Sequence, residues 1–127
     1  MTAYKKTPDP RHDLPDRRLC ETRRVQTPEG HTIHLTVGFD PEEPDRPREV
    51  FYSGGFRTGS QLEFQVQDAC VLISLLLQHG LRPDAILKSL AQTEKPGLWI
   101  EGDQEPAPET VHASHVGLIV AELAEQP

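Results

Sequence analysis

The segment SGGFRTGS at residues 53–60 has the residue types that best suit ligand chemistry in this sequence. Glycines beside an expected helix start leave backbone N–H groups open to an anion, and an arginine adds a cation. The combination predicts a phosphate-binding loop. The candidate ligand residues are Gly54, Gly55, Arg57, Gly59 and Ser60, with Arg23 and Arg24 as supporting cations.

The same segment also fits a plain connection from a strand to a helix. Ser60 and Glu63 have the S-x-x-E spacing of a capping box, in which each side chain satisfies a free backbone N–H at the helix start. The GxxxxGK[ST] phosphate pattern is missing, since no lysine precedes Ser60. We therefore interpret residues 53–60 first as a capped turn and second as an anion site, where Arg57 would matter most.

Other reactive residues do not form a recognised pattern. Cys20 and Cys70 lack zinc-ligand or disulfide-framework spacing, and Cys70 falls in the most apolar segment, which predicts a buried thiol. His112 and His115 lie three residues apart on an expected helix, but no third ligand has a recognised spacing. No triad spacing, G-x-S-x-G, dinucleotide fingerprint or HExxH occurs, so we expect no catalytic residues and no metal.

Charge divides the chain unevenly. Residues 1–24 hold seven Lys/Arg against four Asp/Glu, a net +3, whereas residues 25–127 hold six against sixteen, a net −10. The acidic body disfavours DNA binding, and the basic N-terminal end suits an acidic or anionic partner. With no run of about 18 apolar residues and no secretory signal, we expect a cytoplasmic protein without a membrane span.

The expected elements give an α+β domain. Residues 1–16, with three prolines, predict a flexible basic arm ahead of one domain at residues 17–127. Alternation of polar and apolar residues predicts an antiparallel sheet of about three strands, at residues 18–26, 31–39 and 48–52, with a polar loop at 40–48.

Three helices are expected after the strands, in the order β-β-β-α-α-α, packed on one face of the sheet. The first covers residues 60–79 and is expected to end at Gly80, a glycine in the left-handed cap position. The second covers residues 83–91, and the third, after a loop at 92–107, is opened by Pro108 and ends near Glu125. The first helix is apolar on nearly all sides from residue 69 to 77, which predicts a central helix covered on several sides. Its expected inward stripe is Leu62, Val66, Ala69, Ile73 and Leu76.

A series of short motifs resembles a known family over about residues 14–125. In order they are PDRR at 15–18, GHTIHLTVGFD at 30–40, REVF at 48–51, TGS at 58–60, ISLLLQHGL at 73–81 and P-G-x-W-x-E-G-D at 96–103. The series is similar to the TSCPD-type domain near the C-terminus of adenosylcobalamin-dependent, class II ribonucleotide reductases. The Ser-Cys-Pro-Asp stretch behind the family name is absent from this chain.

The resemblance implies a link to deoxyribonucleotide synthesis but not catalysis by this chain. In the reductases a large barrel holds the radical cysteine and the cobalamin, and 127 residues cannot build that barrel. The family label would be ribonucleoside-diphosphate reductase. No catalytic residue carries over, and adenosylcobalamin belongs to the full-length enzymes, so we expect no cofactor here.

These observations favour a free-standing accessory or regulatory domain that acts by binding a protein, with a ribonucleotide reductase as the candidate partner. One alternative is a nucleotide- or phosphate-binding domain that uses residues 54–60. Another is a structural or assembly domain unrelated to nucleotide metabolism, such as a homodimer.

Overall fold

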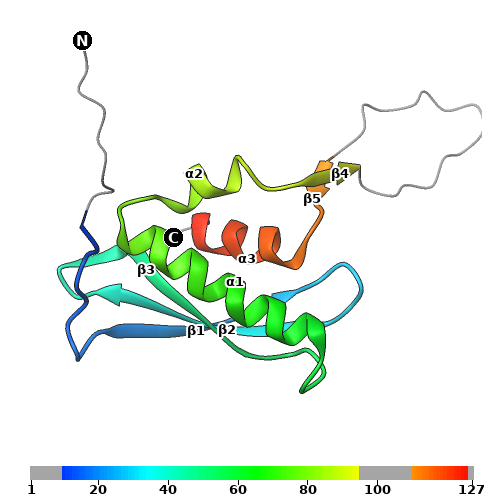
Figure 1. The fold of residues 1–127 in the computed structure, drawn as a ribbon, viewed down its shortest axis with the longest axis horizontal. Coiled ribbons are helices and arrows are strands. Elements are labelled where there is room, and N and C mark those ends of the chain that lie inside the picture. The colour runs from blue at the N-terminus through cyan, green and yellow to red at the C-terminus, as the bar shows by residue number, and fades with distance from the viewer. Residues whose placement is uncertain (1–9, 95–109, 126–127) are drawn as a thin grey trace, which may run out of the picture.

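The computed structural model describes residues 10–94 and 110–125, in which a three-stranded sheet is covered on one face by helices (Figure 1). The elements are β1 (Leu19–Gln26), β2 (Thr32–Asp40), β3 (Glu43–Gly54), α1 (Gln61–Gln78), α2 (Pro83–Leu87), β4 (Gln92–Glu94), β5 (Thr110–His112) and α3 (His115–Ala124). The main sheet is antiparallel with the order β1-β2-β3, and β4 pairs with β5 in a separate ribbon. The predicted α+β class and the order of three strands before the three helices are confirmed. No helix in the described ranges combines the length and apolarity needed to span a membrane.

The β1–β2 hairpin forms as its alternation predicts. Val25 pairs with Ile33, and the tight turn between them closes with a hydrogen bond from the Gly30 N–H to the Thr27 carbonyl at 3.0 Å. Gly30 has a φ of 89°, a conformation that glycine adopts without steric cost. Three side chains of β2 are fully buried beneath the helices, those of Ile33, Leu35 and Val37. The hairpin therefore forms the sheet side of the hydrophobic core.

Strand β3 begins at Glu43, so the loop predicted at residues 40–48 is wrong for most of its length. The polar, proline-rich composition of this stretch is typical of a loop. It is compatible with pairing here because β3 is an edge strand, where proline, which has no N–H to donate, is tolerated. Pro47 pairs with Phe39, and register shifts beside Phe39 take up the irregularity.

Helix α3 begins at His115, later than the predicted start at Pro108, which lies outside the described residues. The Ser114 hydroxyl caps the helix by accepting the Gly117 N–H at 3.0 Å. Immediately before this cap, β5 pairs with β4, so residues 92–94 of the predicted loop are a strand. Three-residue strands are too short for alternation to reveal them.

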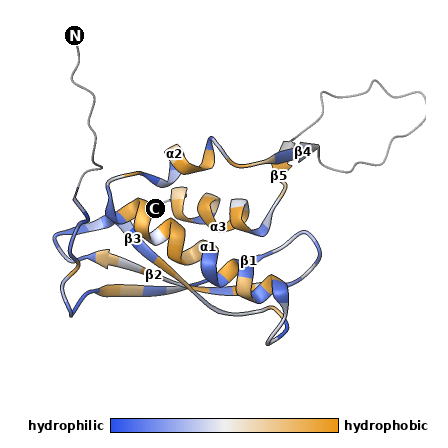
Figure 2. Ribbon diagram, in the orientation of Figure 1, coloured by the Kyte–Doolittle hydropathy of each residue, from blue (hydrophilic) through white to orange (hydrophobic). Residues whose placement is uncertain are grey.

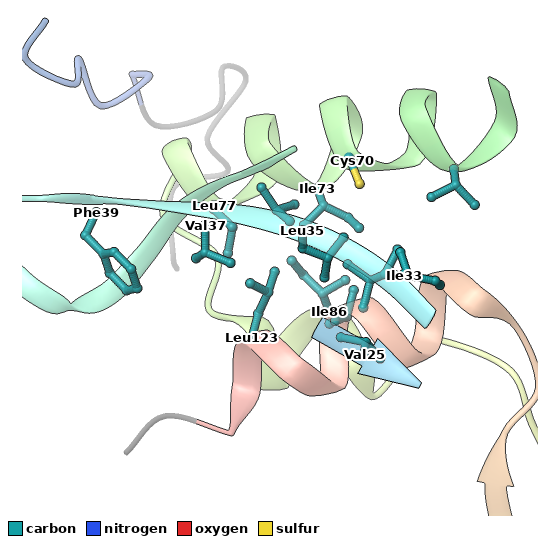
Figure 3. Packing of buried hydrophobic residues seen from close by; sticks show 14 residues of the cluster. Val25, Ile33, Leu35, Val37, Phe39, Cys70, Ile73, Leu77, Ile86 and Leu123 are labelled. Atoms are coloured by element: carbon teal, nitrogen blue, oxygen red, sulfur yellow. The ribbon is translucent and has the colours of Figure 1, made fainter. Parts of the chain in front are cut away.

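The core lies between the sheet and the buried sides of the three helices (Figure 3). Cys70, Ile73 and Leu77 of α1 point toward Leu35 and its neighbours on β2, and Leu123 of α3 closes the other side. The buried thiol predicted for Cys70 is confirmed. Its pKa is raised to about 11 because burial disfavours the thiolate.

The buried stripe of α1 differs from the predicted one, and the helix is not covered on several sides. The buried stripe consists of Val66, Cys70, Ile73, Ser74, Leu77 and Gln78. Val71 and Leu72 are 57% and 62% exposed, and Leu62 and Leu76 of the predicted stripe are also exposed. Because hydrophobic residues continue around α1 (Figure 2), apolarity alone did not indicate which side faces the sheet.

Ser74 explains this orientation of α1. Its hydroxyl accepts the Val50 N–H at 2.9 Å and donates to the Val50 carbonyl at 3.1 Å, on the edge of β3 that no strand of the described residues covers. One side chain thus satisfies two buried backbone groups, each of which is costly to leave unpaired.

The orientation of α1 predicts opposite effects for two neighbouring substitutions. Ile73→Ala should lower the free energy of unfolding by about 2–5 kcal/mol, because it leaves a cavity in the core. Leu72→Ala should change it by no more than about 0.5 kcal/mol, because its side chain is already in solvent. Urea denaturation of both variants tests this, and equal losses would show that Leu72 is buried in solution.

Candidate functional site

The glycine segment at residues 53–60 joins β3 to α1. Gly54, Gly55 and Gly59 have φ values of 154°, 131° and 79°. A side chain at Gly55 would collide with the Thr32 carbonyl and the Ile33 backbone, so this glycine is required for close packing on β2.

Several backbone N–H groups of this segment already have partners within it. The Gly59 N–H donates to Glu63 Oε1 at 3.0 Å, the Ser60 N–H to the Arg57 carbonyl at 3.1 Å, and the Glu63 N–H to Ser60 Oγ at 3.2 Å. The predicted capping role of Ser60 and Glu63 is confirmed, with Gly59 as the donor to the glutamate. This geometry favours the capped turn over the anion site, and the role of Arg57, which is exposed, stays a prediction.

The structure separates the two supporting cations. Arg23 donates to the Glu122 carbonyl at 3.0 Å and lies 6.0 Å from the centre of the Phe39 ring, so it packs beneath α3. Arg24 pairs with His34, which in turn pairs with Gly54. Arg24 is therefore in register with the start of the glycine segment, and Arg23 has a structural environment elsewhere.

Phe56 of the glycine segment is part of an aromatic cluster. The Phe56 ring stacks on Tyr52 with centroids 5.9 Å apart and meets the His115 ring edge-on at 5.0 Å. The Phe56 N–H donates to the Tyr52 hydroxyl at 2.7 Å. His112 lies on β5 and His115 on α3, so they do not share one helix as the sequence suggested. Within residues 10–94 and 110–125, no three His, Cys, Asp or Glu side chains are grouped to hold a metal.

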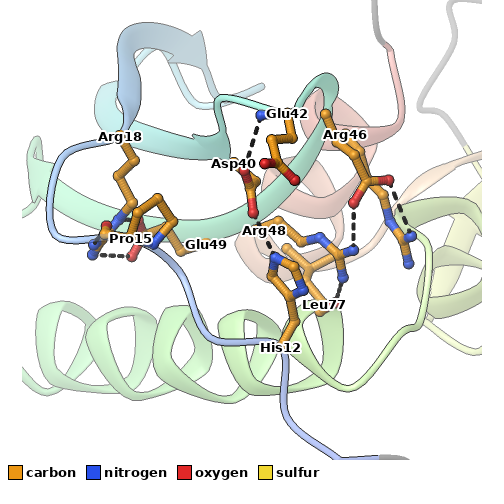
Figure 4. Close-up of polar contacts among 10 residues, drawn as sticks. His12, Pro15, Arg18, Asp40, Glu42, Arg46, Arg48, Glu49 and Leu77 are labelled. Carbon is orange, nitrogen blue, oxygen red and sulfur yellow. Dashed lines mark hydrogen bonds and ion pairs between the residues drawn. The ribbon is translucent and has the colours of Figure 1, made fainter.

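A second charged cluster, which no sequence motif indicated, lies at the other end of α1 (Figure 4). Arg48 is buried, and it donates to the Leu77 carbonyl at 3.1 Å and to Glu43 Oε1 at 3.0 Å. Arg46 donates to the Gly80 carbonyl at 3.1 Å. Both guanidiniums therefore stabilise the negative end of the helix, where backbone carbonyls lack intrahelical donors.

The last-turn carbonyls of α1 are all satisfied by this arrangement. Gly80 has a φ of 101°, and the N–H groups of Gly80 and Leu81 donate to the carbonyls of Leu77 and Leu76, the predicted glycine cap. The Gln78 carbonyl accepts the His12 N–H at 2.7 Å. Residue 12 is thereby tied to the end of α1.

The N-terminal segment (residues 10–18) crosses from α1 to β1 and adds a histidine–carboxylate hydrogen bond and an ion pair (Figure 4). His12 Nε2 lies 2.7 Å from Asp40 Oδ2, and Arg18 pairs with the buried carboxylate of Glu49. Glu49 lies against Gly38, where any side chain would collide with it. The Glu49 pairing raises the pKa of Arg18.

An open hollow of about 420 Å³ lies beneath this segment, and we call it the α1-end hollow. It is lined by Pro10, Arg11, His12, Asp13, Arg46, Arg48, Gln78, His79 and Gly80. One feature of the sequence could have indicated the α1-end hollow. Arg46 and Arg48 are two residues apart, which on a strand places side chains on one side, but the stretch read as a loop.

The fold and these contacts define a small α+β domain with a capped, partly exposed central helix. A family model of the TSCPD domain matches residues 3–123, and the chain belongs to this family. TSCPD domains are found in class II ribonucleotide reductases, which confirms the predicted resemblance. No curated protein and no solved structure matched the chain.

The Asp40 carboxylate should make stability sensitive to acid. The Glu42 N–H, the His12 ring and Arg48 lower the pKa of Asp40, so the folded state holds its proton less tightly than the unfolded chain, where the value is about 3.9. The stabilisation is therefore complete above that value and is lost as the pH falls through the lower folded pKa. Asp40→Asn should be less stable than the parent at pH 7, and the difference should shrink below about pH 4. Urea denaturation across pH measures this, and a constant difference down to pH 3 would contradict it.

The two thiols should differ in reactivity. Cys20 is exposed, whereas Cys70 is buried and its pKa is about 11. A thiol-specific reagent at pH 8 should therefore modify Cys20 in the native protein and Cys70 only after unfolding. Mass spectrometry of the labelled chain checks this, with Cys20→Ser as the control that should remain unlabelled when native.

Proposed function

We propose that this TSCPD domain is an accessory domain that binds a protein partner through the outward side of α1. The carrying observation is the exposure of large apolar side chains on one helix. They are Leu62, Phe64, Val71, Leu72 and Leu76, and we call them the α1 face.

The α1 face has the composition of a protein-binding surface. Val71 and Leu72 are 57% and 62% exposed, and Phe64 is 49% exposed. Only Glu63 and Asp68 are charged among the residues of α1, in a chain that is 26% charged. Apolar surface with few charges is typical of the buried centre of a protein interface.

A ribonucleotide reductase is the partner that we propose. The family membership supports this choice, because TSCPD domains are found in class II reductases. The domain would thereby support deoxyribonucleotide synthesis in the cytoplasm without catalysing it. The alternative use of residues 54–60 for a nucleotide has less support, because three of the segment's N–H groups already have internal acceptors.

A binding experiment with a matched control tests the proposal. The purified chain is titrated into the class II reductase of its source organism, and affinity is measured by sedimentation or calorimetry. Leu72→Glu should weaken binding by at least about tenfold, because it places a charge in the centre of the interface. Leu19→Glu is the control, since Leu19 is 53% exposed on β1, away from α1.

Light scattering of the chain alone separates this proposal from assembly. A monomer that binds the reductase supports the accessory role. A stable homodimer that Leu72→Glu dissociates, without reductase binding, would show that a second copy covers the α1 face and would overturn the choice of partner. Equal losses for Leu72→Glu and Leu19→Glu would exclude the α1 face as the contact.

A further inference from the structure

The α1-end hollow gathers positive charge in an acidic protein. Its lining includes Arg11, Arg46 and Arg48 against one carboxylate, that of Asp13, a balance of +3 − 1 = +2 before either lining histidine is counted. The whole chain has a formal charge of −7. A local surplus of this sign on such a background is a site where an anion gains Coulomb energy.

Nearby carboxylates neutralise only part of this surplus. Arg46 and Arg48 share Glu43, whose oxygens lie 3.7 Å from Arg46 Nη1 and 3.0 Å from Arg48 Nη2. Asp40 also lies close enough to Arg48 for the arginine's charge to lower the pKa of Asp40, so Glu43 and Asp40 together offset two of the positive charges, while Arg82 near Arg46 adds one. Burial lowers the pKa of Arg46, and the positive charges of Arg48 and Arg82 lower it further.

Arg46, which is partly buried, and Arg48, which is buried, each have a donor that no described residue uses. Nε of Arg46 and Nε of Arg48 are buried and meet no acceptor among the described residues. Arg48 as a whole is only 5% exposed. A guanidinium has five N–H groups, and the contacts with Leu77, Gly80 and Glu43 use only some of them. Capping α1 therefore leaves some N–H groups of both guanidiniums without an acceptor among the described residues.

We propose that the α1-end hollow binds the phosphate group of a small ligand, with Arg46 and Arg48 as its inner cations and Arg11 as the outer one. Arginine suits phosphate because its planar N–H groups match two oxygens at once. The hollow's volume of about 420 Å³ falls within the range of small-molecule pockets. Arg11 belongs to the N-terminal segment, and its side chain also contacts Gln78 of α1. An anion bound by Arg11 would therefore hold this segment against α1.

The site is tested by titrating the full chain with pyrophosphate, ATP and adenosine at constant ionic strength, using calorimetry. Pyrophosphate and ATP should bind and adenosine should not, because the phosphate is the recognised group. Binding of ATP but not pyrophosphate would mean that the nucleoside is recognised and would overturn the proposal, as would no binding of either.

Variants separate this site from the glycine segment. Arg46→Gln and Arg11→Ala should each weaken pyrophosphate binding by at least about tenfold, as expected for a lost charge-assisted hydrogen bond. Arg11 is exposed, so its variant keeps the test valid if Arg46→Gln unfolds. Arg57→Ala is the matched control and should bind normally. Loss of binding in Arg57→Ala but not in Arg11→Ala would place the ligand at residues 53–60 and overturn the proposal.

Discussion

The orientation of α1 on the sheet is the constraint on which the rest of the structure depends. Ser74 satisfies both the N–H and the carbonyl of Val50 on the uncovered edge of β3. If α1 turned about its axis, Ser74 would move away from β3 and the two Val50 backbone groups would lose their hydrogen-bond partner, which costs more free energy than an apolar contact there would provide. A single serine in a nearly apolar stretch therefore decides which hydrophobic residues form the core and which face solvent.

The same orientation explains the charged cluster at the end of α1. The helix ends over the first half of β3, so its last carbonyls face Arg46, Arg48 and the N-terminal segment. Carbonyls at a helix end need donors, and guanidiniums provide both hydrogen bonds and the favourable charge. Capping α1 therefore brings Arg46 and Arg48 together at the C-terminal end of the helix. Their N–H groups that have no acceptor among the described residues make this end suitable for an anion.

The two ends of α1 thus differ in what they can offer a ligand. At the N-terminal end, where the positive end of the helix dipole suits anions, Ser60 and Glu63 already accept the nearby N–H groups. At the C-terminal end the dipole is unfavourable to an anion, but the guanidiniums outweigh it because they carry full charges. Between the two ends, the α1 face is exposed and nearly free of charge, which suits a protein partner.

The sequence by itself determined the elements whose signals are local. Alternation specified β1 and β2, the S-x-x-E spacing specified the start of α1, Gly80 specified its end, and the motif series specified the family. Only the tertiary structure decided the extent of β3, the ribbon of β4 and β5, and the side of α1 that is buried. These depend on edge pairing and on one serine meeting a strand 24 residues away in sequence, neither of which leaves a periodic pattern. The α1-end hollow was hidden for the same reason, because its cations come from residues 11, 46 and 48, which only folding brings together.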